Sequence, residues 1–288
     1  SEDGVSIGGF GLKVRTEDIA CFGQLYLRRG TWEGRQLLSE EWVDAATRRQ
    51  TSNGSNPDSD WEQGYGYQFW RCRHGAYRGD GAFGQFCLVL PEQDAVIAIT
   101  SGTRNMGRVM DLVWEKLLPG FREKPLEADP VAMKLRERLD SLELPAVEGG
   151  GRPKKMESRV ALIPMAMEAN ALKIDSLQLV HFLTNPVLSL EVAGRKHEMK
   201  VGIGKWATSS SEIARVFNPR AFSGSQPIAA SGAWTADAVF ETRIWFTETP
   251  FALDLKLSFD DKDGVTVTGE HHVAFGPRKI PELRGTLR

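Results

Sequence analysis

The chain has 288 residues and a formal net charge of −2, and 41% of its residues are hydrophobic. This length fits one large domain or two medium ones, and the apolar content is sufficient for a substantial core. The balanced charge lacks the basic excess typical of nucleic-acid-binding proteins, so we expect no nucleic-acid partner. No apolar run is long enough to cross a bilayer, and we expect no membrane-spanning segment.

Three cysteines, Cys21, Cys72 and Cys87, form an odd set without metal-ligand spacing. We interpret them as free thiols, which slightly favours the cytoplasm or another reducing compartment but leaves the compartment undetermined. The chain opens with SEDGVSIGG instead of Met. This start reads like the interior of a longer protein, so we expect a processed or truncated piece.

Two helices are predicted within the first fifty residues. The stretch RTEDIACFGQLYLRRG has Thr16 as a candidate N-cap, acidic residues in the first turn and Gly30 at its end. Ser39 is a candidate N-cap for the second helix, because two glutamates and then an apolar face follow it. Residues 52–60, SNGSNPDSD, have the composition of a loop.

The next elements are predicted to be strands and then helices. We expect a strand and a turn over 64–75, followed by a glycine turn and a β-hairpin with strands at 85–90 and 94–100. Both hairpin strands are apolar on both faces, so both faces should be covered. Asn105 is placed to cap a third helix, and Asp129–Pro130 to start a fourth.

The composition changes after VEGGGRPKK (147–155), which we interpret as a linker. Residues 158–288 contain short alternating runs separated by turn signals, a pattern typical of an antiparallel barrel or sandwich. Three of these runs, within 230–259, are predicted as strands that pack Trp234, Trp245 and Phe251 inward. Structural support is the favoured role of this region, with a ligand-holding barrel as the alternative.

The sequence contains no clear metal-binding or nucleophile motif. His271 and His272 are adjacent, so on a strand they point to opposite faces and cannot share one ion; we predict no metal and no cofactor. No S-x-x-K or Y-x-N motif occurs in the chain. We therefore expect no activated nucleophile within this chain. His74 is expected in a hairpin turn, although a place at a cleft mouth is the alternative.

Three phrases stand in order within residues 4–118: GGFGLKVRTEDIACFGQLYLRRGTWEGRQLLSEEWVDAAT, then GYGYQFW, then GDGAFGQFCLVLPEQDAVIAIT. They resemble phrases of serine hydrolases related to β-lactamases and penicillin-binding proteins. In that family, such phrases follow the tyrosine motif in the same order. The family's Lys-Thr-Gly or His-Thr-Gly motif would fall on Gly79, Asp80 and Gly81, so no cation stands at its first position.

The resemblance implies a site on the strand that begins near residue 77. The backbone N–H of Ala82 would be one oxyanion-hole donor, with Gly81 beside it, and Gly79, Asp80 and Tyr77 would contact substrate. Glycines here would let a substrate carbonyl approach the backbone. Two alternatives stay open from the residues: a glycine-rich strand start that only permits tight packing, and for Asp80 an ordinary turn aspartate.

The expected fold class is α+β: the C-terminal half of a β-lactamase/transpeptidase-like α/β sandwich, followed by an all-β domain. The predicted segments are 1–124, 125–157 and 158–288. By resemblance, the parent would hydrolyse an ester or amide through an acyl-serine, with its nucleophile upstream of this chain. The alternative is a non-catalytic binding or scaffold protein. Expected partners are a small ester or amide substrate, and either the protein's own N-terminal hydrolase fragment or a second copy.

Overall fold

The computed structural model describes residues 8–9, 11–124, 130–151, 153–161, 163–180, 186–218 and 224–287. The chain divides into two compact units, Ser1–Leu135 and Arg136–Arg288, and it combines helices with mostly antiparallel sheets, so the α+β class is confirmed. The division falls inside a helix, whereas the sequence placed a separate connecting segment at 125–157; that segmentation stays a prediction.

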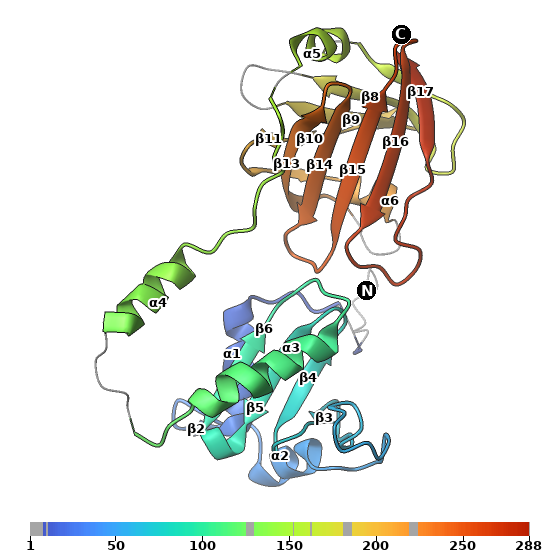
Figure 1. Cartoon of the computed structure of the whole chain (residues 1–288). Helices are drawn as coiled ribbons and strands as arrows, with labels where there is room; N and C mark the ends of the chain where they lie inside the picture. Colours follow the sequence, from blue (N-terminus) through green and yellow to red (C-terminus); the bar gives the residue numbers. More distant parts are fainter. Residues whose placement is uncertain are drawn as a thin grey trace. The chain divides into compact units, whose positions relative to one another are not determined.

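Unit 1 contains a four-stranded sheet, a small hairpin and helices on both faces of the sheet (Figure 1). Its elements are α1 (Thr16–Leu27), β1 (Thr31–Trp32), β2 (Arg35–Gln36), α2 (Glu40–Thr47), β3 (Trp70–Arg71), β4 (Tyr77–Gly81), β5 (Gln85–Leu90), η1 (Pro91–Gln93), β6 (Ala95–Ile99), α3 (Met106–Leu112), η2 (Val113–Leu117), η3 (Leu118–Gly120) and α4 (Pro130–Asp140), which crosses the unit boundary.

The sheet order is β3-β4-β5-β6, and all neighbours are antiparallel. β5 and β6 form the hairpin predicted at 85–90 and 94–100, so that prediction is confirmed. α3 crosses one face of this sheet and α1 covers the other (Figure 1). Both faces are therefore covered, as the apolar character of the hairpin strands predicted.

Two of the three predicted helix caps are confirmed. The Ser39 hydroxyl accepts from the Trp42 N–H at 3.1 Å, and the Asn105 side chain accepts from the Arg108 N–H at 3.0 Å. The cap at Thr16 is wrong, because Arg15 holds the N-cap position of α1 and donates its N–H to Asp18 at 3.2 Å. The Thr16 hydroxyl instead lies 3.1 Å from that of Thr100, beside β6.

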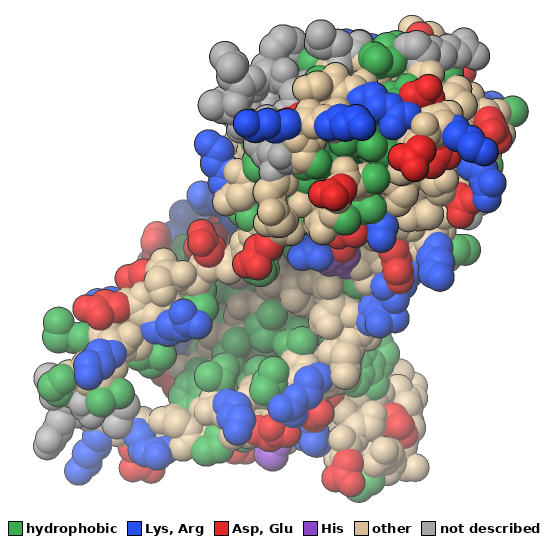
Figure 2. All heavy atoms as spheres, turned by 45° about the horizontal axis from the view of Figure 1, so that its top comes forward, with side chains coloured by type: hydrophobic (Ala, Val, Ile, Leu, Met, Phe, Trp, Pro, Cys, Tyr) green, Lys and Arg blue, Asp and Glu red, His purple; other side chains and the backbone are tan. Residues whose placement is uncertain are grey.

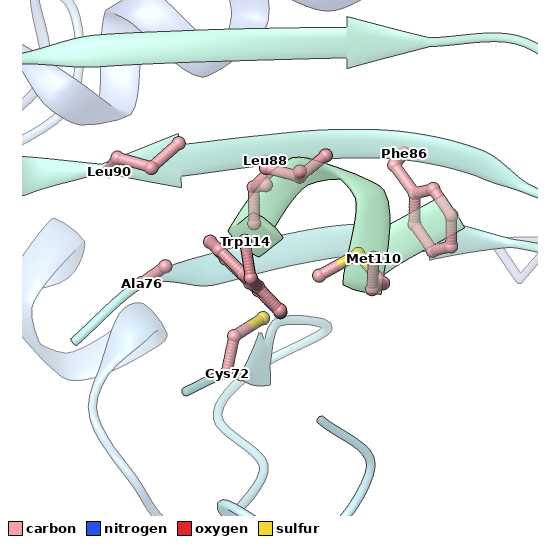
Figure 3. Packing of buried hydrophobic residues seen from close by; sticks show 8 residues of the cluster. Cys72, Ala76, Phe86, Leu88, Leu90, Met110 and Trp114 are labelled. Atoms are coloured by element: carbon pink, nitrogen blue, oxygen red, sulfur yellow. The ribbon is translucent and has the colours of Figure 1, made fainter. Parts of the chain in front are cut away.

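Two apolar clusters hold the sheet between its helices. In the first cluster, side chains of the strands point toward α3 and η2 (Figure 3). Its members include Cys72, Phe86, Leu88, Leu90, Met110 and Trp114. The second lies on the opposite face, with members Tyr26, Val43, Ala46, Phe69, Tyr77 and Val89. Burying such side chains contributes about 1.5–3 kcal/mol each, so these layers fix the position of β4.

The strand predicted over 64–75 is largely wrong. Only Trp70–Arg71 form a strand there, and Tyr65 makes isolated bridges to Thr51 and Trp70. Gly64 and Gln68 have positive φ of 115° and 66°, conformations that interrupt an extended strand. His74 lies in the turn after β3 with φ of 57°, and its ring is 5.0 Å from that of Trp114, so its hairpin-turn interpretation is confirmed.

Unit 2 contains an eleven-stranded sheet in the order β10-β9-β8-β7-β17-β16-β15-β14-β13-β11, and β12 also pairs with β13. The Lys200 N–H of β10 donates to the Ser209 hydroxyl of β12 at 3.4 Å, so the sheet nearly closes into a barrel. Its elements are α5 (Lys154–Val160), β7 (Met165–Met167), β8 (Ile174–Val180), β9 (Val187–Val192), β10 (Arg195–Lys200), β11 (Gly202–Ile203), β12 (Ala207–Ser211), α6 (Ile213–Phe217), β13 (Gln226–Ala236), β14 (Val239–Phe246), β15 (Ala252–Phe259), β16 (Gly264–His271) and β17 (Leu283–Leu287).

The three strands predicted within 230–259 are β13, β14 and β15, but one of their side chains points the other way. Trp234 and Phe251 are buried as expected. Trp245 faces outward with its ring 5.2 Å from His272, because the alternation of β14 directs Ile244 and Phe246 inward. His271 is buried and His272 contacts Asp254 at 3.1 Å, so the adjacent histidines do lie on opposite faces.

The linker predicted at 147–155 is not free of the sheet. The Val147 N–H donates to the Ser231 hydroxyl at 3.0 Å, and the Gly150 N–H donates to the Trp234 carbonyl at 3.2 Å. Lys154 already begins α5. This segment therefore runs along β13 as part of unit 2, although its glycines read as a flexible connection.

Candidate functional site

Strand β4 presents different side chains to its two faces. Tyr77 belongs to the cluster under α1 and α2, and Gly79 and Gly81 share its face by the two-residue alternation of a strand. Arg78 and Asp80 point to the other face, where Arg78 is fully buried. The glycines are therefore separated from both charged side chains by the strand itself.

The buried Arg78 is held by several partners on that second face. Its Nη2 and Nε donate to Asp80 Oδ2 at 2.7 and 3.0 Å, and its Nη1 donates to the Asp60 carbonyl at 2.8 Å. Its guanidinium also lies 4.5 Å from the centre of the Trp61 ring. Burial raises the pKa of Asp80 above its ordinary value, and Arg78 opposes that shift.

Asp80 and Tyr77 are consequently enclosed on the two faces of β4, so this geometry does not support their substrate-binding assignments, which stay predictions. Asp80 is neither a cleft aspartate nor an ordinary turn aspartate, because it faces inward and pairs with Arg78. Tyr77 is 5% exposed beneath the helices, and burial raises the pKa of its hydroxyl. The sequence alone did not indicate that Tyr77 and Asp80 would be enclosed on opposite faces of β4.

The outer edge of β4 is open where the glycines stand. β3 pairs only with Tyr77 and Arg78, so within the described chain no strand lies beside Gly79–Gly81 on that side. Gly79 also leaves free space on its face, because a Cβ there would meet only the Cys87 Cβ, at 3.6 Å. A substrate could therefore approach the backbone of β4 from this edge.

The turn after β4 directs one amide outward. The Gly81 carbonyl accepts from the Gly84 N–H at 3.3 Å, so that carbonyl points into the turn. Because a trans peptide is planar, the N–H of Ala82 in the same peptide unit points the opposite way. Ala82 is exposed, and its N–H makes no hydrogen bond to any residue that the structure describes. This geometry is that of an available backbone donor.

Neighbouring groups hold the rest of this turn. Gln85 Nε2 donates to the Ala82 carbonyl at 3.3 Å, and the Thr103 N–H donates to the Phe83 carbonyl at 3.0 Å. Phe83 has φ of 66°, a left-handed conformation that is unfavourable for a bulky residue and often marks a functional turn. Nothing in the sequence signals the left-handed conformation of Phe83, or the hydrogen bond that the distant Thr103 makes to its carbonyl.

The buried cysteines are unsuited to act as nucleophiles. Burial raises the pKa of Cys72 to about 11, even though Arg78 Nη1 lies 3.0 Å from its sulfur. Burial likewise raises the pKa of Cys87 to about 11. Both are therefore neutral thiols near pH 7, and the thiolate is the reactive form. No group of three or more metal-ligating side chains occurs among the described residues.

Comparison with known proteins adds no family. No family model matches the chain, and no curated protein matches it. In the described part of the chain, every helix is too short or too polar to cross a membrane. The candidate site at Gly79, Gly81 and Ala82 is thus defined by its geometry and by the resemblance of its sequence phrases.

Proposed function

We propose that unit 1 forms one wall of the cleft of an acyl-serine hydrolase that acts on an ester or amide. The observation that supports this most directly is the exposed Ala82 N–H, which points outward at the open edge of β4. One such donor contributes about 3–4 kcal/mol to the stabilisation of an oxyanion. The proposal includes the finer fold, the closing half of a β-lactamase/transpeptidase-like sandwich.

In the proposed reaction, a serine outside residues 1–288 attacks the substrate carbonyl carbon while its proton passes to a base. The carbonyl oxygen becomes an anion and accepts hydrogen bonds from the Ala82 N–H and from the serine's own N–H. Collapse expels the alcohol or amine, which takes up a proton, and leaves an acyl-serine. Water then attacks that ester by the same route and releases the acid. By resemblance, the serine belongs to an S-x-x-K motif and a tyrosine acts as the base.

The charge around β4 favours substrates without a carboxylate at this strand. A carboxylate-binding hydrolase needs a cation that reaches the cleft. Gly79 carries no charge, and the adjacent Arg78 is held on the opposite face by Asp80 and the Asp60 carbonyl. An uncharged ester fits this edge better than a β-lactam or a peptide carboxylate.

The missing part of the cleft requires a polypeptide partner. β6 ends the sheet, and its residues Ala95–Ile99 include no charge or proline that would discourage strand pairing. Hydrophobic side chains also lie at the surface of unit 1 (Figure 2). Phe22, Trp42 and Tyr67 are each 48% exposed. We infer that this unit pairs with its own N-terminal hydrolase segment or with a second copy.

The first test is activity-based labelling of the natural polypeptide that contains these residues. A fluorophosphonate should label a serine outside residues 1–288, and residues 1–288 alone should not be labelled. Ala82→Pro removes the N–H and should slow labelling about 100-fold, while Ala82→Gly keeps the N–H and should label at the original rate. Melting followed by circular dichroism checks that both variants fold.

Two results would overturn the proposal. A labelled serine within residues 1–288 would contradict an external nucleophile. A folded natural polypeptide that is not labelled would favour the non-catalytic binding or scaffold role, which the lack of S-x-x-K and Y-x-N in this chain also motivates. Pairing is tested separately by light scattering, since a monomer of residues 1–288 at micromolar concentration would contradict a second copy at β6.

A further inference from the structure

The segment that follows β6 returns to the turn at Ala82–Gly84 and contacts it through Ser101. We propose that Ser101 is a positioning residue, which holds this turn in the shape that directs the Ala82 N–H outward. This inference rests on the proposed function, since it concerns the same donor. It adds a residue that neither the sequence motifs nor the resemblance indicates.

The Ser101 side chain binds the inner side of the turn. Its Oγ lies 3.0 Å from the Phe83 carbonyl oxygen and 2.9 Å from the Gly84 carbonyl oxygen, so one hydroxyl proton serves two acceptors. Both carbonyls are thereby directed toward Ser101 and away from the open edge of β4. Because each peptide unit is planar, fixing these two carbonyls also fixes the N–H groups of Gly84 and Gln85. The Gly84 N–H in turn holds the Gly81 carbonyl, which shares its peptide unit with the Ala82 N–H.

The backbone of Ser101 makes a second connection to the same turn through Gln85. Gln85 Nε2 donates to the Ser101 carbonyl at 2.5 Å and to the Ala82 carbonyl at 3.3 Å. The Ser101 N–H in turn donates to Gln85 Oε1 at 3.3 Å. The carbonyl of Ala82 is therefore tied to Ser101 through one side chain, and the carbonyls of Phe83 and Gly84 are tied to it directly.

The close approach of Ser101 explains why a glycine stands at position 84. A Cβ on Gly84 would lie 2.2 Å from Ser101 Oγ, which is far shorter than a permitted contact. Gly84 also has φ of 93°, which a residue with a side chain rarely adopts. Together with the left-handed Phe83, this makes the turn one that would relax to another shape without its hydrogen bonds to Ser101.

Ser101 acts through the turn and not on the reacting atoms. Its hydroxyl proton is already bonded to the carbonyls of Phe83 and Gly84, so it would not bond the oxyanion. Loss of this hydroxyl should therefore weaken transition-state stabilisation and leave binding of the ground state nearly unchanged. A fall in the rate constant of labelling, without a change in the probe concentration at half saturation, distinguishes this role from a purely structural one.

The test measures the rate constant of labelling at saturating fluorophosphonate, and the probe concentration at half saturation, on the natural polypeptide. Ser101→Ala should lower the rate constant at least tenfold with little change in half-saturation, and Ser101→Thr, which keeps the hydroxyl, should recover most of it. Thr100→Ala is the matched control, because its hydroxyl bonds Thr16 and not the turn. If Ser101→Ala fails to fold, Gln85→Met, which removes the donor to the Ala82 carbonyl, should show the same split.

The outcomes separate this inference from the proposed function. Labelling of the unmodified protein together with an unchanged rate constant in a folded Ser101→Ala variant overturns the role of Ser101 and leaves the proposed function intact. Loss of labelling in Thr100→Ala to the same degree would also overturn it, because the effect would then be general. No labelling of the unmodified protein overturns the proposed function, and the role of Ser101 in it falls with it.

Discussion

The buried carboxylate of Asp60 connects three separate parts of unit 1. Its Oδ1 accepts the Arg73 N–H at 3.0 Å, and its Oδ2 accepts from Arg73 Nε, Arg73 Nη2 and Trp114 Nε1 at 3.1, 2.8 and 2.8 Å. The loop before β3, the turn after it and the helical η2 are thereby joined. We expect the free energy of unfolding of unit 1 to depend strongly on this one side chain.

Asp60→Asn tests this dependence with little change in shape. Asp60 is 3% exposed, and in either orientation of the new amide its NH2 group faces at least one of the four donors. Removing one partner of a buried charged pair costs about 3–5 kcal/mol. Arg73 is 24% exposed and keeps its ion pair with Asp111 in the variant. We therefore expect a loss at the lower end of this range, about 3 kcal/mol, and a fall in Tm of about 10 °C.

The assay is urea unfolding followed by circular dichroism and by tryptophan fluorescence, to which Trp114 contributes together with the seven other tryptophans. Asp111→Asn is the matched control: it removes the other carboxylate partner of the same arginine, at a site that is 44% exposed, and should cost less than about 1 kcal/mol. Equal losses in the two variants would refute the reasoning, because burial would then not determine the cost. A loss below about 1 kcal/mol in Asp60→Asn would refute it as well.

Three further predictions concern pH and the glycine turn. Hydrogen bonds from His272 and Arg243 outweigh the effect of burial and lower the pKa of Asp254 to about 2. The stability that ionised Asp254 contributes is therefore complete above pH 3.8 and is lost as the pH falls through 2. Asp254→Asn should make the free energy of unfolding less dependent on pH in that range. Burial lowers the pKa of His271, so stability should fall as pH drops below about 6.5, and His271→Gln should remove that slope. Gly84→Ala should lower the free energy of unfolding by about 2 kcal/mol more than Gly34→Ala does. Both glycines have positive φ, but a Cβ at Gly34 would meet no atom within 4 Å. Equal losses in urea unfolding would contradict the contact with Ser101.

Local signals in the sequence were sufficient for several elements. The hairpin at 85–90 and 94–100 follows from two apolar runs around a short polar corner, and the caps at Ser39 and Asn105 follow from side chains that bind nearby amides. Such features depend on residues within a few positions of one another. The nearly closed all-β unit was likewise predictable, because its strands alternate and its turns carry clear signals.

Errors arose where partners are distant in sequence. Thr16 was expected to cap α1, but its hydroxyl lies beside that of Thr100, 84 residues away. Trp245 was expected inside the barrel, but β14 turns it outward because Ile244 and Phe246 occupy the inner face. Apolar character identifies a strand that will be buried, whereas the register of the whole sheet decides which of its residues face the core.

The sequence by itself determined the hairpin strands that follow residue 84, because apolar runs and the polar corner between them act locally. Only the tertiary structure decided what the residues around position 80 face. It paired Asp80 with Arg78 on the inner side, buried Tyr77 and brought Ser101 to the turn at Ala82. The physical reason is that the direction of an amide depends on hydrogen bonds to residues distant in the chain, and these partners meet only once the sheet has folded.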